Sequence, residues 1–440
     1  MRIQLPGKVQ KIIETLQAAG YEAYAVGGCI RDSILGKEPD DWDITTSANP
    51  QEVKKLFSRT LDTGIQHGTV TVMLEKEGFE VTTYRIDGIY EDGRHPKDVT
   101  YTSELSEDLK RRDFTINAIA YNEKDGLIDL FEGMQDIERG VIRCVGDPRE
   151  RFSEDALRMM RAIRFSAQLG YIIEDKTKAA IKELAPNLQK ISAERIQTEL
   201  VKLLVSDNPD YLRTAYETGI TAYFIPEFDI CMETGQNNPH HCYSIGEHIL
   251  HTLSYVAPDK TLRLGMLFHD IGKPQTLTID EKGVTHNHGH AAVGEEMTVK
   301  ILRRLKFSND TIDKVRRIVR YHDYKIEPDA KAVRRAASKI GNDIFPLLFL
   351  VKYADIMAQS LYEREEKLQK LYRVKEIYEQ IIEKEECLSL KDLAVSGRDL
   401  IAAGMEPGKE VGECLHKLLD IVLEHPEYNQ KEYLLSILKI

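Results

Sequence analysis

Two aspartates, Asp41 and Asp43, are separated by one residue and follow a glycine pair, Gly27 and Gly28. On a β-strand, residues two apart project from the same face, so the two carboxylates would lie side by side. Carboxylates that close repel each other unless a cation lies between them, and Mg²⁺ binds a few carboxylates together with substrate phosphates. Glycines after a strand let an anion approach free backbone N–H groups. The pattern therefore predicts a site for a metal-bound phosphate group.

An acidic surface turn over residues 38–41 would also explain part of this segment. The full string, however, reads GG-x-x-RD followed by P-x-D-x-D. It resembles motif A of the nucleotidyltransferases and, more narrowly, the class II tRNA nucleotidyltransferases, which are the CCA-adding enzymes and their bacterial poly(A) polymerase relatives. The resemblance implies catalytic roles and Mg²⁺ binding for Asp41 and Asp43, and nucleotide binding by Gly28 and Arg31.

Composition limits the class of protein. The chain has 440 residues, 42% hydrophobic and 30% charged, which is typical of a globular protein with several domains. No apolar run reaches the length of about 18 residues that a membrane span needs, and the amphipathic N-terminus is unlike a signal peptide. We therefore expect no membrane partner. Six scattered cysteines without a CxxC pair indicate reduced thiols and a cytoplasmic location.

The charge pattern bears on the partner. A net charge of −12 argues mildly against a phosphate-rich partner, because such proteins usually carry a basic surface. Arginines nevertheless gather within the first 170 residues, at Arg111, Arg112, Arg158, Arg161 and Arg164. We expect an acidic protein with a basic groove.

Residues 69–85 alternate Thr and Val, then turn at Glu-Lys-Glu-Gly and return, which predicts a β-hairpin. Glu80 lies early in the return strand. In the class II family an acidic residue at this place completes the carboxylate set, which implies a catalytic role for Glu80. An exposed strand glutamate would give the same pattern.

Residues 86–104 are rich in Gly and Asp and show no periodicity, which predicts a loop. Long loops in compact domains are often functional. Asp92, Arg94 and Pro96 match the D-x-R-x-P string of the flexible loop in CCA-adding enzymes, where the loop helps the switch to ATP. CC-adding relatives have a shortened loop, so the resemblance favours complete CCA addition.

Two adjacent arginines, Arg111 and Arg112, open the string RRDFTINA. Guanidinium groups match phosphate oxygens in a bidentate manner, so the pair suits a triphosphate. Asp113 and Asn117 are four residues apart, on one face of an expected helix, and could contact a ribose hydroxyl. A helix cap is the alternative for Asp113 alone. The string resembles the class II family specifically, which implies nucleotide binding by all four residues.

The segment from Ser153 onward predicts a helix with Ser153 as N-cap and an apolar stripe at helical spacing. Asp155 and Arg158 lie three residues apart on its exposed face, where an acceptor and a donor could pair with the Watson–Crick edge of cytosine or adenine. A plain ion pair between them is the alternative. The string E-D-x-x-R with further arginines resembles the family's protein template, which implies base selection by Asp155 and Arg158 and a weaker contact from Arg161.

Histidines become frequent after residue 238. Their order with aspartate, H…HD…H…H…D, resembles the HD superfamily of metal-dependent phosphohydrolases. The resemblance implies a core metal set of four residues, and all four are present: His248, His269, Asp270 and Asp355. His290 and His322 lie within the same order. Imidazoles together with carboxylates suit a transition metal, which would activate water against a phosphoester. The alternatives are a hydrolase acting on damaged tRNA ends and a scaffold that only holds tRNA.

The tail strings at 397–400 and 404–408 resemble the G-x-D-L…G-x-x-P-G pattern of the C-terminal tRNA-binding region, and a helical packing module is compatible with them. The resemblance spans the chain and implies an α+β fold. A small mixed α/β nucleotidyltransferase head would occupy 1–145. An all-helical neck with the nucleotide-selecting and RNA-binding helices at 146–235, an HD body at 236–360 and a tRNA-binding tail at 361–440 would follow.

The predicted function is that of a CCA tRNA nucleotidyltransferase, which adds C, C and A to the tRNA 3′ end from CTP and ATP without a nucleic-acid template. The predicted partners are tRNA, CTP and ATP. A poly(A) polymerase shares the motifs, and an A-adding enzyme would accept only tRNA that already ends in CC. An RNA-binding HD phosphohydrolase with an inactive head is the alternative from another class.

Overall fold

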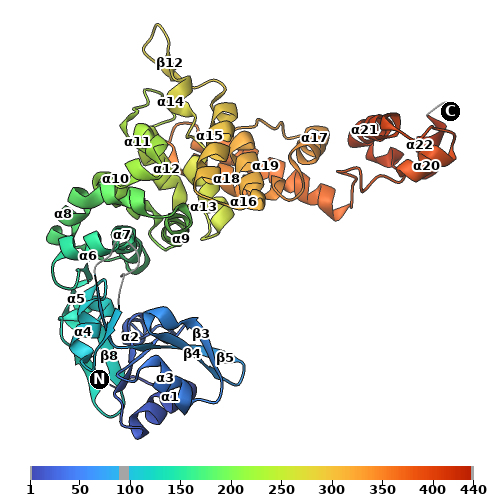
Figure 1. The fold of residues 1–440 in the computed structure, drawn as a ribbon. Coiled ribbons are helices and arrows are strands. Elements are labelled where there is room, and N and C mark those ends of the chain that lie inside the picture. Colours follow the sequence, from blue (N-terminus) through green and yellow to red (C-terminus); the bar gives the residue numbers. More distant parts are fainter. Residues whose placement is uncertain (1, 89–98, 438–440) are drawn as a thin grey trace. The chain divides into compact units, whose positions relative to one another are not determined.

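The computed structural model describes residues 2–88 and 99–437. The chain forms two compact units, Met1–Pro226 and Glu227–Ile440, and each is described by itself. The first unit runs from blue to green in Figure 1, and the second runs from green to red. The predicted loop residues Asp92, Arg94 and Pro96 lie outside the described residues.

A mixed sheet of seven strands organises the first unit, in the order β3-β4-β5-β2-β1-β8-β9. The strands are β1 (Ala23–Val26), β2 (Ile44–Thr46), β3 (Thr60–Gly64), β4 (Thr69–Leu74), β5 (Glu77–Thr83), β8 (Ile119–Asn122) and β9 (Gly126–Asp129). Only β2 and β5 pair in parallel, and the other neighbours are antiparallel. All residues of β1 are buried, as expected of a strand covered on both faces.

Short helices accompany this sheet. They are α1 (Gly7–Ala18), α2 (Gly28–Ile34), α3 (Pro50–Leu56), α4 (Leu105–Lys110) and α5 (Gly133–Arg139). α1 is amphipathic, and its buried face contacts β1. The predicted hairpin is confirmed by the antiparallel pairing of β4 with β5. Two further strands, β6 (Arg85–Asp87) and β7 (Val99–Tyr101), pair with each other within the segment expected as a loop.

Helices complete the first unit. They are α6 (Pro148–Glu154), α7 (Leu157–Leu169), α8 (Asp175–Leu184), α9 (Ala193–Leu204) and α10 (Leu212–Glu217). A short parallel pair joins β10 (Val141–Ile142), in the predicted head, to β11 (Ile172–Ile173), which interrupts the neck expected to be all-helical.

The predicted N-cap at Ser153 is wrong. Asp147 caps α6 by accepting a 2.8 Å hydrogen bond from the Arg149 N–H, and α6 then continues through Ser153. The chain leaves the helix at Asp155, whose carboxylate accepts a 3.0 Å hydrogen bond from the Leu157 N–H before α7 begins. Asp155 therefore lies at a break between two helices and not in the first turn of one.

The second unit is mostly helical. Its helices, the first of which begins at the border residue, are α11 (Pro226–Glu233), α12 (Ile245–Leu253), α13 (Lys260–Phe268), α14 (Lys273–Thr276), α15 (His290–Arg304), α16 (Asn309–Tyr321), α17 (Ala330–Ile340), α18 (Phe345–Ala358), α19 (Arg364–Glu383), α20 (Gly397–Ala402), α21 (Lys409–Glu424) and α22 (Lys431–Ser436). One antiparallel pair, β12 (Thr278–Ile279) and β13 (Thr285–His286), joins them. The predicted α+β class, with a small mixed head before a helical remainder, is confirmed. No helix of the described residues is long and apolar enough to cross a membrane.

Candidate functional site

Three acidic side chains meet at the start of β2. Asp41 and Asp43 lie just before this strand rather than on it, because the strand begins at Ile44. Asp43 still follows the sheet, since its carbonyl accepts a 3.0 Å hydrogen bond from the Val26 N–H in β1. The parallel register of β2 with β5 places Glu80 opposite Asp43. The aspartates and Glu80 are therefore brought together by two neighbouring strands.

These carboxylates influence each other's charge. Although Asp43 reaches solvent, the surrounding protein partly desolvates its carboxylate and raises its pKa. Arg112 opposes the rise, and the nearby charges of Asp41 and Glu80 add to it. Repulsion of this kind is relieved by a bound cation. The donor set consists of carboxylate oxygens alone, which fits a hard divalent ion such as magnesium or manganese.

The glycine pair lies directly beside the carboxylates. Gly27 has φ 90° and ψ −136°, a conformation that residues with a Cβ rarely adopt. A Cβ at Gly27 would lie 3.2 Å from Nη1 of Arg112 and 4.0 Å from Oδ2 of Asp43. Among the described residues, Nε of Arg112 is buried without a hydrogen-bond partner. An unpaired buried donor beside a glycine turn fits an anionic ligand.

A hydrogen-bonded chain continues from Arg31. Its Nη1 donates a 2.7 Å hydrogen bond to Oδ1 of Asn117, and Nδ2 of Asn117 donates a 3.2 Å bond to Oδ1 of Asp113. Asp113 then forms a 2.6 Å ion pair with Arg161. Gly28 adjoins the same group, because a Cβ there would lie 3.6 Å from Nη2 of Arg31. Five predicted nucleotide-binding residues thus form one contiguous set.

The predicted α-helix around Asp113 and Asn117 is wrong. Asp113 lies in a bend, and only the 3₁₀ helix η2 (Thr115–Asn117) follows. The Asp113 carboxylate accepts a 2.8 Å hydrogen bond from the Phe114 N–H, a local bond that competes with helix formation. Burial alone would favour the neutral acid, but the Arg161 guanidinium lowers the pKa of Asp113 and keeps it ionised.

Asp108 holds the arginine pair in place. Its buried carboxylate accepts a 2.7 Å hydrogen bond from Arg111, a 3.4 Å bond from Arg112 and a 3.0 Å bond from Oγ1 of Thr45 on β2. Sequence reasoning missed this role, although an acid three and four residues before two arginines is a detectable signal.

Asp155 and Arg158 do not pair with each other. Asp155 forms a 2.7 Å ion pair with Arg195 on α9, while Arg158 forms a 2.6 Å ion pair with Glu154 and donates a 3.0 Å bond to the Arg111 carbonyl. The plain ion pair between Asp155 and Arg158 is therefore wrong, because the helix break at Asp155 removes the helical spacing. Arg195 was not anticipated.

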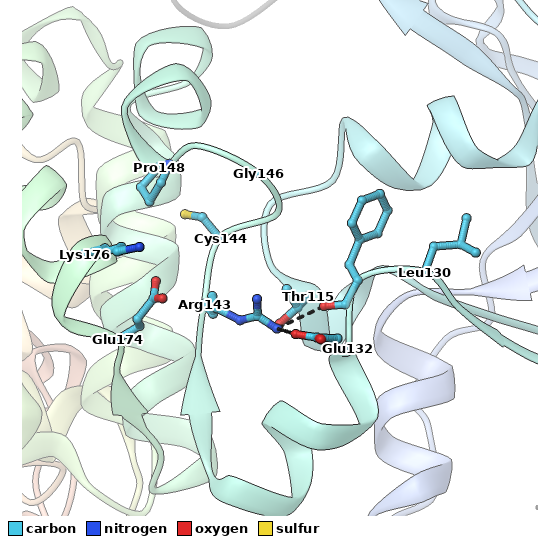
Figure 2. A pocket seen from close by; sticks show the side chains of 10 residues that line it. Thr115, Leu130, Glu132, Arg143, Cys144, Gly146, Pro148, Glu174 and Lys176 are labelled. Atoms are coloured by element: carbon cyan, nitrogen blue, oxygen red, sulfur yellow. Dashed lines mark hydrogen bonds and ion pairs between the residues drawn. The ribbon is translucent and has the colours of Figure 1, made fainter.

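A cavity of about 370 Å³ lies elsewhere in the first unit. Its wall includes Thr115, Glu132, Arg143 and Lys176, and Figure 2 shows Arg143 turned toward Glu132. Arg143 is already paired with Glu132 at 3.1 Å and with Asp136 at 2.8 Å. None of the predicted site residues lines this cavity.

Six side chains of the second unit form what we call the HD cluster: His248, His269, Asp270, His290, His322 and Asp355. His248, His269 and Asp270 offer atoms close enough to share one metal ion, and Asp270, His290 and His322 offer a second such group. Nε2 of His248 lies 2.9 Å from Oδ1 of Asp355. The four predicted ligands are thus brought together, and two further histidines join them.

The imidazoles of the HD cluster are oriented by the backbone. Nδ1 of His269, His290 and His322 lies 2.7–2.8 Å from the carbonyls of Met266, Asn287 and Val319 respectively. A carbonyl accepts only, so each Nδ1 must carry the proton. In a neutral ring, Nε2 then carries the lone pair that a metal binds.

The same geometry brings ring nitrogens of the HD cluster close to each other. Nε2 of His269 lies 3.3 Å from Nε2 of His248, and Nε2 of His290 lies 3.1 Å from Nε2 of His322. Nε2 of His290 and Nε2 of His322 are both unprotonated in the neutral rings, so they repel each other at that distance, and a cation between them removes the repulsion. Nε2 of His248 lies within hydrogen-bond distance of the acceptor Asp355, so in the absence of a cation it donates to that carboxylate. The mixed imidazole and carboxylate donors fit a transition metal.

Comparison with known proteins agrees with the head's geometry. Residues 23–143 match the model of the poly A polymerase head domain, which makes this a nucleotidyltransferase. Residues 170–232 match the "Probable RNA and SrmB- binding site of polymerase A", and residues 290–438 match the model described as "tRNA nucleotidyltransferase domain 2 putative". Divalent-metal dependence follows from the family.

Several relatives are CCA-adding enzymes. The chain is 35% identical to that of Lactobacillus helveticus, over 94% of this chain and 92% of the relative. It is 56% identical to that of Lactiplantibacillus plantarum over 47% of this chain, and the match spans about half (51%) of that relative. The chain also resembles the crystal structure of the Bacillus stearothermophilus CCA-adding enzyme in complex with CTP, with a TM-score of 0.76 and 31% sequence identity. The match covers 99% of this chain and 98% of that one. The chain belongs to the CCA-adding enzyme family.

Proposed function

We propose that this protein is a CCA tRNA nucleotidyltransferase that adds C, C and A to the tRNA 3′ end from CTP and ATP. The observation that carries the proposal is the meeting of Asp41, Asp43 and Glu80 beside the Gly27 turn and Arg112. Relatives that match almost the whole chain are CCA-adding enzymes, and one was solved with CTP. Free thiols, most of them buried, support a cytoplasmic location.

Asp41 and Asp43 would hold Mg²⁺, and Glu80 would complete the catalytic carboxylate set beside them. When bound there, Mg²⁺ would activate the 3′-hydroxyl of tRNA and stabilise the departing pyrophosphate. The chain's own residues orient the reactants. Gly28 and Arg31 approach the nucleotide at the start of α2, and Arg111 and Arg112 pair with its phosphates.

Nucleotide identity is assigned to residues of the neck. Asp113 and Asn117 contact the ribose, while Asp155 and Arg158 read the base and Arg161 supports them. A carboxylate has about four lone-pair sites, so Asp155 can accept a base N–H while Arg195 remains bound. We assign the head to 1–145, the neck to 146–235, the HD body to 236–360 and the tRNA-binding tail to 361–440.

A second activity is favoured by the HD cluster. We propose that His248, His269, Asp270 and Asp355 bind a transition metal, that His290 and His322 complete the site, and that the site hydrolyses a phosphate ester. The support is the convergence of four imidazoles with the buried Asp270 and the partly exposed Asp355, an arrangement that a scaffold role would not require.

Sequencing of the products tests the main proposal. The substrate is tRNA that ends before CCA, supplied with CTP and ATP together. We expect C, C and A in order, whereas a poly(A) polymerase would give an A tract and an A-adding enzyme would require a CC end.

Asp41→Ala should abolish incorporation and keep tRNA binding. Asp62→Ala is the matched control, because Asp62 is an exposed head aspartate that forms a 2.9 Å ion pair with Lys54. Retained incorporation in Asp41→Ala would contradict the assignment.

A further inference from the structure

A group of side chains outside the HD cluster is linked to it through Gln359. Nε2 of Gln359 donates a 3.1 Å hydrogen bond to Oδ2 of Asp355, and Nζ of Lys367 donates a 2.8 Å bond to Oε1 of Gln359. Nζ of Lys367 also lies 3.0 Å from Nδ1 of His240. One carboxamide therefore separates the Lys367 ammonium from a carboxylate of the cluster.

Lys367 has neutral partners. Across residues 2–88 and 99–437, no carboxylate forms an ion pair with its ammonium group, which is held by a carboxamide oxygen and an imidazole nitrogen. Burial lowers the pKa of Lys367, and burial also lowers the pKa of His240 and keeps its imidazole neutral. The nearby carboxylates of Asp355 and Glu363 oppose the lowering of this pKa, but neither pairs directly with the ammonium group. A partly buried ammonium group whose direct partners are neutral is stabilised when an anion binds to it.

An aromatic surface adjoins this ammonium group. The ring of Tyr362 lies 4.9 Å from the ring of His240, and 50% of Tyr362 is exposed. Its neighbour Leu361 is 79% exposed. The segment is held firmly, because Ser360 donates a 2.9 Å bond from its N–H to the His240 carbonyl and a 2.6 Å bond from its hydroxyl to the Pro239 carbonyl. An exposed ring on an anchored turn can stack on a nucleobase.

We propose that Lys367, His240 and Tyr362 form the substrate-binding part of the HD cluster and take a nucleotide phosphate. Lys367 pairs with the phosphate oxygens, His240 orients Lys367, and Tyr362 stacks on the base. This inference rests on the hydrolytic function proposed for the cluster. A sugar phosphate would use only Lys367, whereas the exposed faces of Tyr362 and Leu361 favour a ligand that carries a base. A free mononucleotide and the phosphorylated end of an RNA share this chemistry.

Binding to the metal-free full chain is the first test, because it proceeds without turnover. Calorimetric titration would compare cytidine 3′-monophosphate, cytidine and ribose 5-phosphate. Lys367→Ala should weaken binding of the 3′-monophosphate about tenfold, as expected for loss of one charged contact, and Lys367→Arg should restore most of it. Tyr362→Ala should weaken the 3′-monophosphate and leave ribose 5-phosphate unchanged. Repeating the titration with a short RNA that ends in a 3′-phosphate separates an RNA end from a free nucleotide by which of the two binds more tightly.

Lys370→Ala is the matched control. Lys370 lies one turn further along α19 and pairs with the exposed Glu327 at 3.0 Å, away from Gln359. The second measurement is KM and kcat for hydrolysis of the same 3′-monophosphate by the metal-loaded chain, where Lys367→Ala should raise KM more than it lowers kcat. Unchanged affinity and KM in Lys367→Ala, or equal losses in Lys370→Ala, would overturn the inference. If the parent chain hydrolyses the 3′-monophosphate but KM is unchanged in Lys367→Ala, the hydrolytic function stands and the binding role of Lys367 fails. If Lys367-dependent binding is found but no hydrolysis, the binding role stands and the hydrolytic function fails.

Discussion

The head carries its three carboxylates at an exposed place on a sheet, whereas the second unit buries His269 and Asp270 at 0% and 1% exposure among helices. The first site offers only oxygen donors, and the second offers four imidazoles and two carboxylates. An open oxygen site suits a hard ion that arrives with a charged substrate, while a buried nitrogen site suits an ion that stays. If both sites bind metal as proposed, we expect the metal of the head to exchange readily and the metal of the HD cluster to stay bound.

The two sites also differ in what orients their side chains. In the HD cluster, backbone carbonyls fix the rings of His269, His290 and His322. In the first unit, the functional side chains are held mainly by other side chains, as Asp108 holds Arg111 and Arg195 holds Asp155. Side-chain pairs can exchange partners when a ligand binds, whereas a backbone carbonyl stays in place. We therefore expect the head and neck to respond strongly to changes of single side chains.

Removal of metal should separate the two sites most clearly. Brief dialysis against EDTA should abolish nucleotide incorporation, and added Mg²⁺ should restore it at once. The HD cluster should keep its metal through the same treatment, as measured by mass spectrometry of the protein's metal content. His269→Ala is the companion variant, which should lose the resident metal and keep incorporation. Loss of the resident metal at the same rate as loss of incorporation would contradict the distinction between the two sites.

The sequence motifs predicted which side chains lie close together, but they did not predict the backbone conformation at those residues. Asp41, Asp43 and the six cluster residues could be predicted because their spacing matches known motifs. The break at Asp155 could not be predicted from the cap preference of Ser153, since Asp147 competes with it and Pro148 favours the earlier start. The 3₁₀ turn at Asn117 could not be predicted for a similar reason. Its cause is a side-chain bond from Asp113 to the local backbone, which spacing alone does not reveal.

Asp108→Asn should show that the head depends on buried ion pairs. The change leaves Arg111 and Arg112 without their shared carboxylate, and breaking a buried pair costs about 3–5 kcal/mol of unfolding free energy. Incorporation should fall as well, because both arginines lose their position. Trp42 is the only tryptophan and lies between Asp41 and Asp43, so its fluorescence reports unfolding of the head.

The same variant has a pH signature. Burial would favour the neutral acid, but Arg111 and Arg112 lower the pKa of Asp108 below its ordinary value. The stabilisation is therefore present above the unfolded value of about 3.9 and is lost as pH falls toward the lowered pKa of the folded state. The difference in stability between parent and variant should be full at pH 7 and shrink below about pH 4. A difference that stays constant down to pH 3 would show that Asp108 acts through packing and not through its charge.

Arg158→Ala gives the smallest overall effect and the most specific one. Arg158 is held by Glu154 and by the Arg111 carbonyl, so its guanidinium is fixed beside the arginine pair and apart from Asp155. If it reads the base, its loss should reduce discrimination of CTP and ATP against UTP and GTP by about 10- to 100-fold, the range for an unpaired hydrogen-bonding group. Single-turnover incorporation of each nucleotide on tRNA lacking its 3′ end measures this directly. Arg149→Ala is the control, because Arg149 on α6 forms an exposed 2.8 Å pair with Glu183. If Arg158→Ala lowers all four rates equally and keeps their order, Arg158 positions the neck and does not read the base. Asp155 would then read the base together with another residue, and Arg195, which already donates a hydrogen bond to Asp155, is the candidate.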